Sequence, residues 1–255
     1  MKHNSLSQTN SFPEIRFRGE LRPSQKEVVD IARHQLAEGN RSLHIVAPPG
    51  SGKTILGLYL WAHHIKRPCL VLSPNSAIQS QWAARTDMFE TGIDSEKMVS
   101  TDPQKPGLLT SLTYQSVTMP IRKDENIQQS ALLLWQEKLI EVGEASDVNE
   151  AMVWIEDLQA HNPDYFNDRL STYSKQVRDE LSMSGQSMSL LHSSSADTLK
   201  RIAALRPGAL ILDECHHLVG HWGRVLSAAH EMLGHPVIIG LTATPPDPTI
   251  KIQEM

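Results

Sequence analysis

Cysteine and aromatic residues are scarce in this sequence. Among its 255 residues there are 2 cysteines, and aromatic residues make up 5%. Two cysteines cannot form a disulfide framework, and neither Cys69 nor Cys215 belongs to a C-x-x-C pair typical of zinc or redox sites. The low aromatic content argues against base stacking as the main means of binding nucleic acid.

Long hydrophobic runs are also missing. The first residues, MKHNSLSQTN, are polar, so no signal peptide is visible. The longest apolar stretch, TILGLYLWA after Lys53, is too short to span a bilayer. We therefore expect a cytoplasmic protein that has no membrane partner.

An excess of positive charge is absent as well. Lys and Arg total 24 against 29 Asp and Glu, a formal net charge of −5, which excludes a uniformly basic nucleic-acid coat but not a local basic groove. Residues 121–200 hold 7 basic and 14 acidic side chains, whereas the rest of the chain is nearly neutral. The 40% of hydrophobic residues allows a sizeable core. The sequence thus predicts a globular domain interrupted by an acidic insert.

Short apolar runs outside the insert predict the strands of one sheet. They lie at 42–47, 69–73, 107–113, 208–214 and 236–243. None alternates clearly with polar residues, which is typical of strands covered on both faces. Helical patterns between the runs favour βαβ units, so we expect an α/β fold with a mostly parallel sheet and helices on both faces.

The insert has helical periodicity instead. We expect helices over 128–142, over 147–160 with Ser146 or Asp147 as N-cap, and from Asn162-Pro163 to Leu181. The serine-rich stretch 182–195 predicts a flexible linker.

The role of the insert has more than one interpretation. Trp135 and Trp154 lie on apolar helix faces, which favours core packing over nucleic-acid stacking. Its acidic charge would repel a DNA backbone, so a protein-binding or gating module is favoured. The alternative is a solvated helical appendage that packs on the sheet.

The segment APPGSGKT, residues 47–54, predicts a phosphate-binding loop. It follows a predicted strand and precedes a helix, although Ala47 stands where the first glycine of G-x-x-x-x-G-K-[ST] is expected. Glycines allow several N–H groups to face one anion at the positive end of a helix. The predicted nucleotide contacts are Pro49, Gly50, Ser51, Gly52, Lys53 and Thr54. Lys53 would contact the outer phosphates, and Thr54 would bind Mg²⁺; the alternative is a strand–loop–helix turn with an incidental lysine.

The segment DECHH, residues 213–217, follows another predicted strand. Adjacent carboxylates at the carboxyl edge of a sheet are costly unless they hold a cation or perform acid–base chemistry. Asp213 is therefore expected to hold Mg²⁺ and Glu214 to polarise the attacking water. A polar strand end is the alternative. Zinc at Cys215 and the following histidines is not favoured, because four ligands are needed and no partner cysteine pair exists.

The segment LTATPPD, residues 241–247, follows the last predicted strand. Thr242 and Thr244 would hydrogen-bond the acidic pair and relay the nucleotide state. Alone this signal is weak, because a turn rich in Thr and Pro after a strand is common.

In this order, APPGSGKT, DECH and TAT resemble motifs I, II and III of superfamily 2 helicases and translocases, most closely the DEAH/DECH type of restriction and repair. The resemblance covers roughly residues 15–120 and 200–247. It implies a RecA-like P-loop domain that uses ATP and Mg²⁺. In the family the histidine at His216 couples the nucleotide to motif III.

Other segments fit the same family. LRPSQ resembles the segment before motif I, which implies that Gln25 recognises adenine, and the nearby Arg22 is a candidate nucleotide contact. Segments 70–82 and 108–117 resemble motifs Ia and Ib, which bind the backbone of the nucleic-acid strand. The residues implied as strand contacts are Pro74, Gln81, Thr113 and Tyr114, and Trp82 and Gln115 also match.

Two features depart from the family: the insert is not a family motif, and the second RecA-like domain with its arginine finger is absent. We expect a disordered tail over 1–14, a RecA-like domain formed by 15–120 and 201–255, and the helical insert over 121–200. The favoured function is the ATP-binding motor domain of a DNA helicase or translocase, with DNA preferred over RNA.

Completion of that motor requires a second RecA-like domain in cis or in trans, and a protein partner is possible at the insert. The alternative is a nucleotide-regulated protein-binding module with negligible hydrolysis of its own. A small-molecule kinase is a weaker reading, because it does not account for LRPSQ, motif Ia or TAT.

Overall fold

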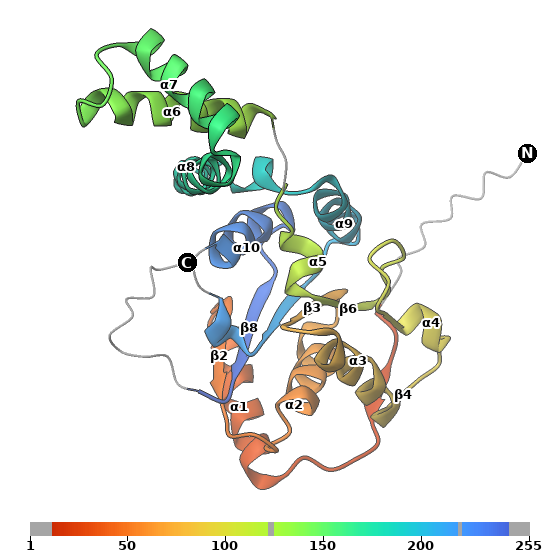
Figure 1. The fold of residues 1–255 in the computed structure, drawn as a ribbon. Helices are drawn as coiled ribbons and strands as arrows, with labels where there is room; N and C mark the ends of the chain where they lie inside the picture. Colours follow the sequence, from red (N-terminus) through yellow and green to blue (C-terminus); the bar gives the residue numbers. More distant parts are fainter. Residues whose placement is uncertain (1–11, 122–124, 219–220, 245–255) are drawn as a thin grey trace, which may run out of the picture. The chain divides into compact units, whose positions relative to one another are not determined.

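The chain divides into two compact units in the computed structural model, which describes residues 12–121, 125–218 and 221–244 (Figure 1). The sheet unit comprises Met1–Val117, Asp197–Val219 and Ala229–Met255. The helical unit comprises Thr118–Ala196 together with Gly220–Ala228. The second segment of the helical unit lies between motifs II and III in the sequence, outside the predicted insert 121–200.

A six-stranded parallel sheet forms the centre of the sheet unit. In spatial order its strands are β2 (Ser42–Val46), β8 (Val237–Thr242), β7 (Ala209–Asp213), β3 (Cys69–Ser73), β6 (Leu109–Thr113) and β5 (Val99–Ser100). All five strands predicted from apolar runs are present, and helices flank the sheet (Figure 1). This is the RecA-like α/β fold that the motifs imply.

The strands differ in burial according to their place in the sheet. Every residue of the central strands β3 and β7 is buried. In β2, by contrast, Leu43 and Ile45 are buried while His44 and Val46 are exposed. The prediction of burial on both faces is therefore wrong for β2, because successive side chains point to opposite faces and the face with His44 and Val46 is exposed.

Three short strands were not predicted. β1 (Ile15–Phe17) pairs antiparallel with β4 (Phe89–Thr91) in a separate ribbon, and β5 extends the main sheet beside β6. Each contains two or three residues, which is too short to produce a recognisable apolar run.

Helices of the sheet unit cover its core. The helices between its strands are α1 (Pro23–Ala37), α2 (Lys53–Leu60) with the π-helical turn η1 (Trp61–Ile65), α3 (Ser76–Arg85), α4 (Ser95–Met98) and α5 (Tyr114–Thr118). One apolar cluster joins Val29 of α1, Leu56 of α2 and Trp82 of α3 to buried strand residues. Two further helices, α9 (Ser193–Ala204) and α10 (His221–Met232), each have residues in both units.

The N-terminal tail is described only in part. Residues 1–11 of the predicted disordered tail lie outside the described residues. Phe12, within the same predicted tail, packs edge-on against Trp61 with ring centroids 5.8 Å apart.

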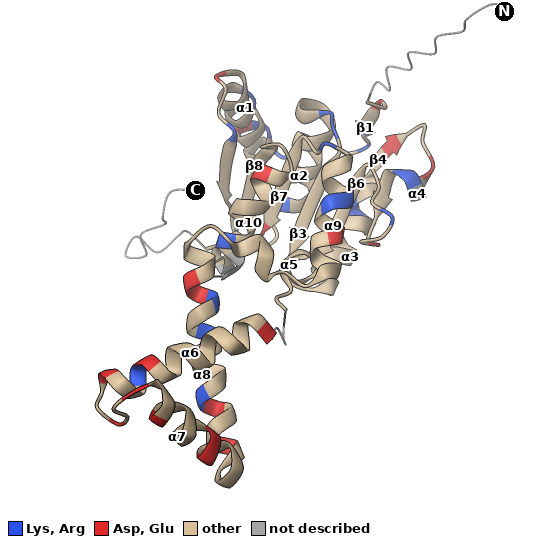
Figure 2. Ribbon diagram, turned by 90° about the horizontal axis from the view of Figure 1, so that it is seen from above, with Lys and Arg blue, Asp and Glu red and all other residues tan. Residues whose placement is uncertain are grey.

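The helical unit has its own core. Its helices are α6 (Glu125–Glu141), α7 (Val148–His161), α8 (Pro163–Met183) and the short 3₁₀ helix η3 (Ser187–Leu190). Trp135 of α6, only 1% exposed, lies 5.7 Å from the ring of Tyr173 and 6.2 Å from that of Trp154. Core packing of the two tryptophans is thereby confirmed. Asp and Glu recur along these helices (Figure 2).

The helix starts of this unit follow the sequence signals. Asp147 caps α7 by accepting a hydrogen bond from the Glu150 amide, and Asn162 caps α8 with Pro163 in its first turn. These side chains satisfy amides that have no partner within the helix.

The flexible linker expected over 182–195 is a wrong prediction. Ser182 and Ser187 are buried, and their hydroxyls lie 3.1 Å apart. Arg224 donates from Nε to Ser182 Oγ at 2.7 Å and pairs with Asp179 at 3.1 Å. The serines stabilise a packed turn because each satisfies a buried polar group of another residue.

Within the described ranges, no helix combines the length and apolar character required to cross a membrane.

Candidate nucleotide-binding site

The phosphate-binding loop predicted from the sequence connects β2 to α2. Gly50 and Gly52 have φ values of 77° and 86°, in the left-handed region that favours glycine. A Cβ on Gly52 would lie 2.4 Å from Gln25 Nε2. The loop therefore requires glycine at position 52 for both its backbone conformation and its close approach to Gln25.

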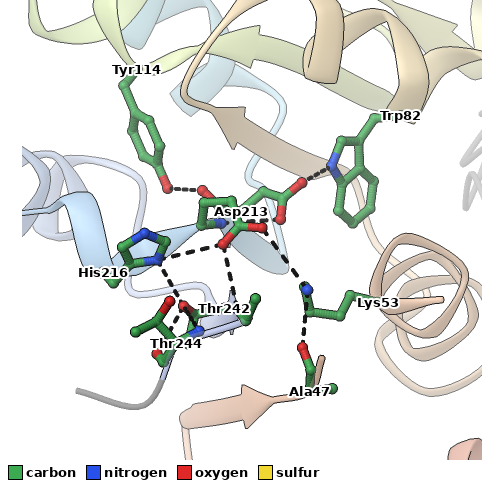
Figure 3. Close-up of polar contacts among 10 residues, drawn as sticks. Ala47, Lys53, Trp82, Tyr114, Asp213, His216, Thr242 and Thr244 are labelled. Carbon is green, nitrogen blue, oxygen red and sulfur yellow. Dashed lines mark hydrogen bonds and ion pairs between the residues drawn. The ribbon is translucent and has the colours of Figure 1, made fainter. Parts of the chain in front are cut away.

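Lys53 begins α2 and closes the loop. Its Nζ donates to the main-chain oxygen of Ala47 at 3.0 Å and lies 3.9 Å from Glu214 Oε1 (Figure 3). The lysine side chain is 11% exposed. Since an ammonium group has three donors, this arrangement leaves capacity for phosphate oxygens.

Asp213 ends β7 and is the most constrained carboxylate of the site. Its Oδ2 accepts from Trp82 Nε1 at 2.6 Å, and its Oδ1 accepts from the Glu214 amide at 3.0 Å (Figure 3). Tyr114 donates its hydroxyl to the main-chain oxygen of Asp213 at 2.9 Å. Burial raises the pKa of Asp213 above its usual value, whereas the hydrogen bond from Trp82 acts in the opposite direction.

Glu214 follows in a strained conformation. Its φ is 50°, and a non-glycine residue in this left-handed region costs about 1–2 kcal/mol. Its Oε2 accepts from the Ala243 amide at 3.4 Å. Such strain concentrates at functional sites, where surrounding contacts hold the residue in place.

A hydrogen-bonded chain links this acidic pair to the end of β8. His216 Nδ1 lies 2.8 Å from Thr242 Oγ1 and 3.4 Å from Glu214 Oε2. Thr242 Oγ1 donates to the Thr244 main-chain oxygen at 3.0 Å and accepts from the Thr244 amide at 3.1 Å. Because the single hydroxyl proton of Thr242 is used for Thr244, we infer that the hydrogen bond with His216 is donated by Nδ1–H.

Comparison with protein-family models identifies the chain. The model of "Type III restriction enzyme, res subunit" matches residues 18–247. The chain belongs to this family. It is the first RecA-like domain of a superfamily 2 helicase-type protein, as its sheet and ordered motifs also indicate.

Among the solved structures similar to this chain is the UvsW helicase from bacteriophage T4. The two sequences are 13% identical and the TM-score is 0.40. The similarity covers 89% of this chain but 53% of the UvsW chain, so the chain spans about half the length of that protein. A search of curated proteins found no match.

Gln25 and Arg22 of the res-family domain hold the phosphate loop. Gln25 Nε2 donates to the main-chain oxygens of Ser51 at 3.1 Å and Gly52 at 3.4 Å, while its Oε1 accepts from the Arg22 amide. Arg22 Nη1 donates to the Gly50 oxygen at 3.1 Å. In this arrangement only the second lone pair of Gln25 Oε1 is left for the amino group of a base.

Two of the expected strand contacts, Pro74 and Thr113, lie at the same edge of the sheet. Ser73 and Thr113 are register partners at the ends of β3 and β6, and Pro74 follows directly. Pro74 and Thr113 are partly exposed, and Gln81 on α3 is exposed. The assignment of Tyr114 as a strand contact is wrong, because its side chain is fully buried and its hydroxyl bonds Asp213.

Trp82 is the functional residue whose role the sequence did not reveal. The motif match singled it out without assigning a task, and its partner Asp213 lies 131 positions away. Its indole is fully buried between α3 and the site. Chain-local patterns contain no signal for such a contact.

The donor set of the site fits Mg²⁺ and a nucleotide. The described part of the chain contains no group of three or more His, Cys, Asp or Glu side chains able to hold a metal. Asp213 and Thr54 offer hard oxygen ligands, and Mg²⁺ often takes one or two of these together with phosphate oxygens and water. The buried hydroxyl of Ser51 has no partner in the described structure, which leaves a donor in the loop for a ligand.

Proposed function

We propose that this chain is the ATP-binding motor domain of a nucleic-acid-dependent ATPase, a DNA helicase or translocase of the restriction or repair kind. It hydrolyses ATP to ADP and phosphate when a second RecA-like domain completes the site. The observation that carries this proposal is the approach of Lys53, in the phosphate loop, to Glu214 beside the buried Asp213. A positively charged phosphate contact and a candidate general base thus lie 3.9 Å apart.

Each residue has a distinct task in this proposal. The loop and Lys53 bind the β- and γ-phosphates, and Asp213 with Thr54 holds Mg²⁺. When bound, Mg²⁺ neutralises charge on the phosphate oxygens. Glu214 accepts a hydrogen bond from the attacking water and orients it toward the γ-phosphate. His216, Thr242 and Thr244 relay the state of this site to the end of β8.

Phosphoryl transfer of this class also needs positive charge on the far side of the nucleotide. We assign this role to an arginine of a second RecA-like domain, in the same chain or in a partner. The nucleic-acid strand runs over Pro74 and Thr113, at the carboxyl ends of β3 and β6, and over the exposed Gln81 of α3. DNA is favoured over RNA from the resemblance to restriction and repair enzymes.

A second candidate is a nucleotide-regulated protein-binding module. The helical unit favours it, because it has a core of its own and its sequence is strongly acidic, a composition suited to a protein partner and not to a nucleic-acid backbone. In this case the chain binds ATP and turns it over negligibly.

ATPase measurements with single-stranded and duplex DNA and RNA separate the two candidates. Stimulation by nucleic acid, in this chain or after addition of a second RecA-like domain, supports the motor. Nucleotide binding that is never followed by turnover supports the binding module. Absence of ATP binding by calorimetry contradicts both, and Lys53→Ala provides the control that lacks the phosphate contact of the lysine.

A further inference from the structure

Asp213 is held by a buried tryptophan from the helix of motif Ia. Trp82 lies on α3, is fully buried, and donates Nε1–H to Asp213 Oδ2 at 2.6 Å. Its neighbour Gln81 is exposed on the same helix, where a strand contact is expected. One turn of α3 thus has a candidate strand contact on its surface and a contact with the metal-binding carboxylate inside.

The same indole touches the helix that begins with the phosphate loop. A Cβ on Gly57 of α2 would lie 2.7 Å from Cη2 of Trp82, which means that the ring lies directly against the α2 backbone. No side chain of Gly57 separates the ring from the helix. Trp82 therefore contacts both motif I and motif II elements.

A second aromatic side chain reaches Asp213 from the motif Ib segment. Tyr114 begins α5, directly after Thr113 at the end of β6, and is fully buried. Its hydroxyl donates to the main-chain oxygen of Asp213 at 2.9 Å. Figure 3 shows the two rings approaching Asp213 from different elements.

We propose that Trp82 is a positioning residue for Mg²⁺ binding, and that Trp82 and Tyr114 connect the two strand-binding segments to Asp213. This inference rests on the proposed function, because it takes Asp213 as a magnesium ligand. Trp82 fixes one carboxylate oxygen and the Glu214 amide fixes the other. Each oxygen keeps a lone pair for a metal-bound water or for Mg²⁺ itself.

An indole is chemically suited to this task. A lysine or arginine partner would orient the carboxylate but also cancel the negative charge that attracts the metal. The indole N–H donates one directional hydrogen bond and carries no net charge. Trp82 can therefore orient Asp213 while the carboxylate keeps its full charge for Mg²⁺.

The test is the affinity for a fluorescent ATP analogue, measured in EDTA and in excess Mg²⁺. Trp82→Phe retains an aromatic ring against α2 but removes the donor. We expect its affinity in EDTA to match that of the wild type, because the phosphate loop is intact. The gain in affinity on adding Mg²⁺ is expected to fall about 10- to 100-fold, the usual loss when a partner of a metal ligand is removed.

Trp61→Phe is the matched control. Trp61 is also fully buried in the sheet unit and donates Nε1–H to a main-chain oxygen, that of Arg67, at 2.8 Å. Trp61→Phe therefore loses the same ring size and one hydrogen bond, as Trp82→Phe does, but Trp61 does not contact Asp213. The Mg²⁺ gain of Trp61→Phe is expected to equal that of the wild type.

The outcomes are distinguishable. An unchanged Mg²⁺ gain in Trp82→Phe, with a normal gain in the wild type, overturns the inference and leaves the proposed function standing. Equal losses in EDTA and in Mg²⁺ also overturn it, because they indicate a packing role. A wild-type chain that binds no nucleotide refutes the proposed function, and the inference with it.

The proposed connection between the nucleic-acid-binding segments and Asp213 is tested by a separate measurement. Single-stranded DNA is expected to change the Mg²⁺ gain of the wild type and of Trp61→Phe equally, and to change that of Trp82→Phe less, because only the Tyr114 contact with Asp213 then remains. Absence of a DNA effect on the wild type overturns the connection between the strand-binding segments and Asp213.

Discussion

Replacement of Gly52 by alanine tests the geometry of the phosphate loop most directly. The new Cβ would stand 2.4 Å from Gln25 Nε2, so the amide must retreat by about 1 Å to reach ordinary contact. The retreat breaks two hydrogen bonds, to the Ser51 and Gly52 oxygens, each worth about 0.5–1.5 kcal/mol. The left-handed conformation adds about 1–2 kcal/mol. We expect Gly52→Ala to lower the free energy of unfolding by about 2–5 kcal/mol.

Gly50→Ala separates the cost of the left-handed backbone from the cost of the steric clash with Gln25. Gly50 has nearly the same φ, 77°, but a Cβ there meets no atom within 4 Å. Gly50→Ala should therefore lower the free energy of unfolding only by the cost of the left-handed backbone conformation, about 1–2 kcal/mol. In a chain that also carries Gln25→Ala, the collision is absent and Gly52→Ala should cost no more than Gly50→Ala.

Urea unfolding of these variants and of the double variant provides the assay. Equal destabilisation by Gly50→Ala and Gly52→Ala in the wild-type background would refute the reasoning. So would a Gly52→Ala cost that stays large after Gln25 is removed, because the energy would then have another source.

Three further predictions concern the chemistry of the site. Lys53→Ala is expected to weaken ATP binding at least about tenfold, since it removes a charged hydrogen bond worth about 1.5–3 kcal/mol, and unchanged affinity in calorimetry would contradict the loop assignment. Glu214→Gln should retain ATP binding and lose at least about a hundredfold in turnover in any complex that hydrolyses ATP; normal turnover would remove Glu214 as the base. Burial raises the pKa of Asp213, so the folded protein retains a proton on this carboxyl that the unfolded chain loses near pH 3.8. The contribution of Asp213 to the free energy of unfolding therefore falls as the pH rises above 3.8, and it is constant above the pKa of the folded state. Urea unfolding without metal measures this effect. As the pH rises through this range, the free energy of unfolding of Asp213→Asn should increase relative to that of the wild type, and a constant difference would contradict the raised pKa.

The parts of the structure that the sequence predicts correctly depend on local chemistry. β3 and β7 are identified because a continuous run of apolar residues is typical of a strand that helices cover on both faces of the sheet. The phosphate loop is identified because Gly50 and Gly52 sit between a strand and a helix, where their left-handed conformations are needed. Asp147 is identified as a cap because its carboxylate competes for helix amides.

The parts that are missed depend on partners distant in the sequence. Tyr114 is expected to contact the nucleic-acid strand because its segment resembles motif Ib, but its hydroxyl donates to the main-chain oxygen of Asp213, 99 positions away. The serines around 182–187 have the composition of a linker, yet each gains a polar partner only in the folded unit. A pattern within one segment contains no information on such contacts.

The path of the chain between motifs II and III has a consequence for any engineering of this protein. The helical unit is built from two segments, and the chain passes between the units four times, after Val117, Ala196, Val219 and Ala228. Excision of 121–200 alone would remove Asp179 and Ser182, the partners of Arg224, and leave residues 221–228 of α10 without the rest of their unit. The segment that joins motif II to motif III along the chain thus includes residues of the helical unit. A variant that removes the helical unit must therefore delete Gly220–Ala228 together with the insert, and must supply a new connection between motif II and motif III.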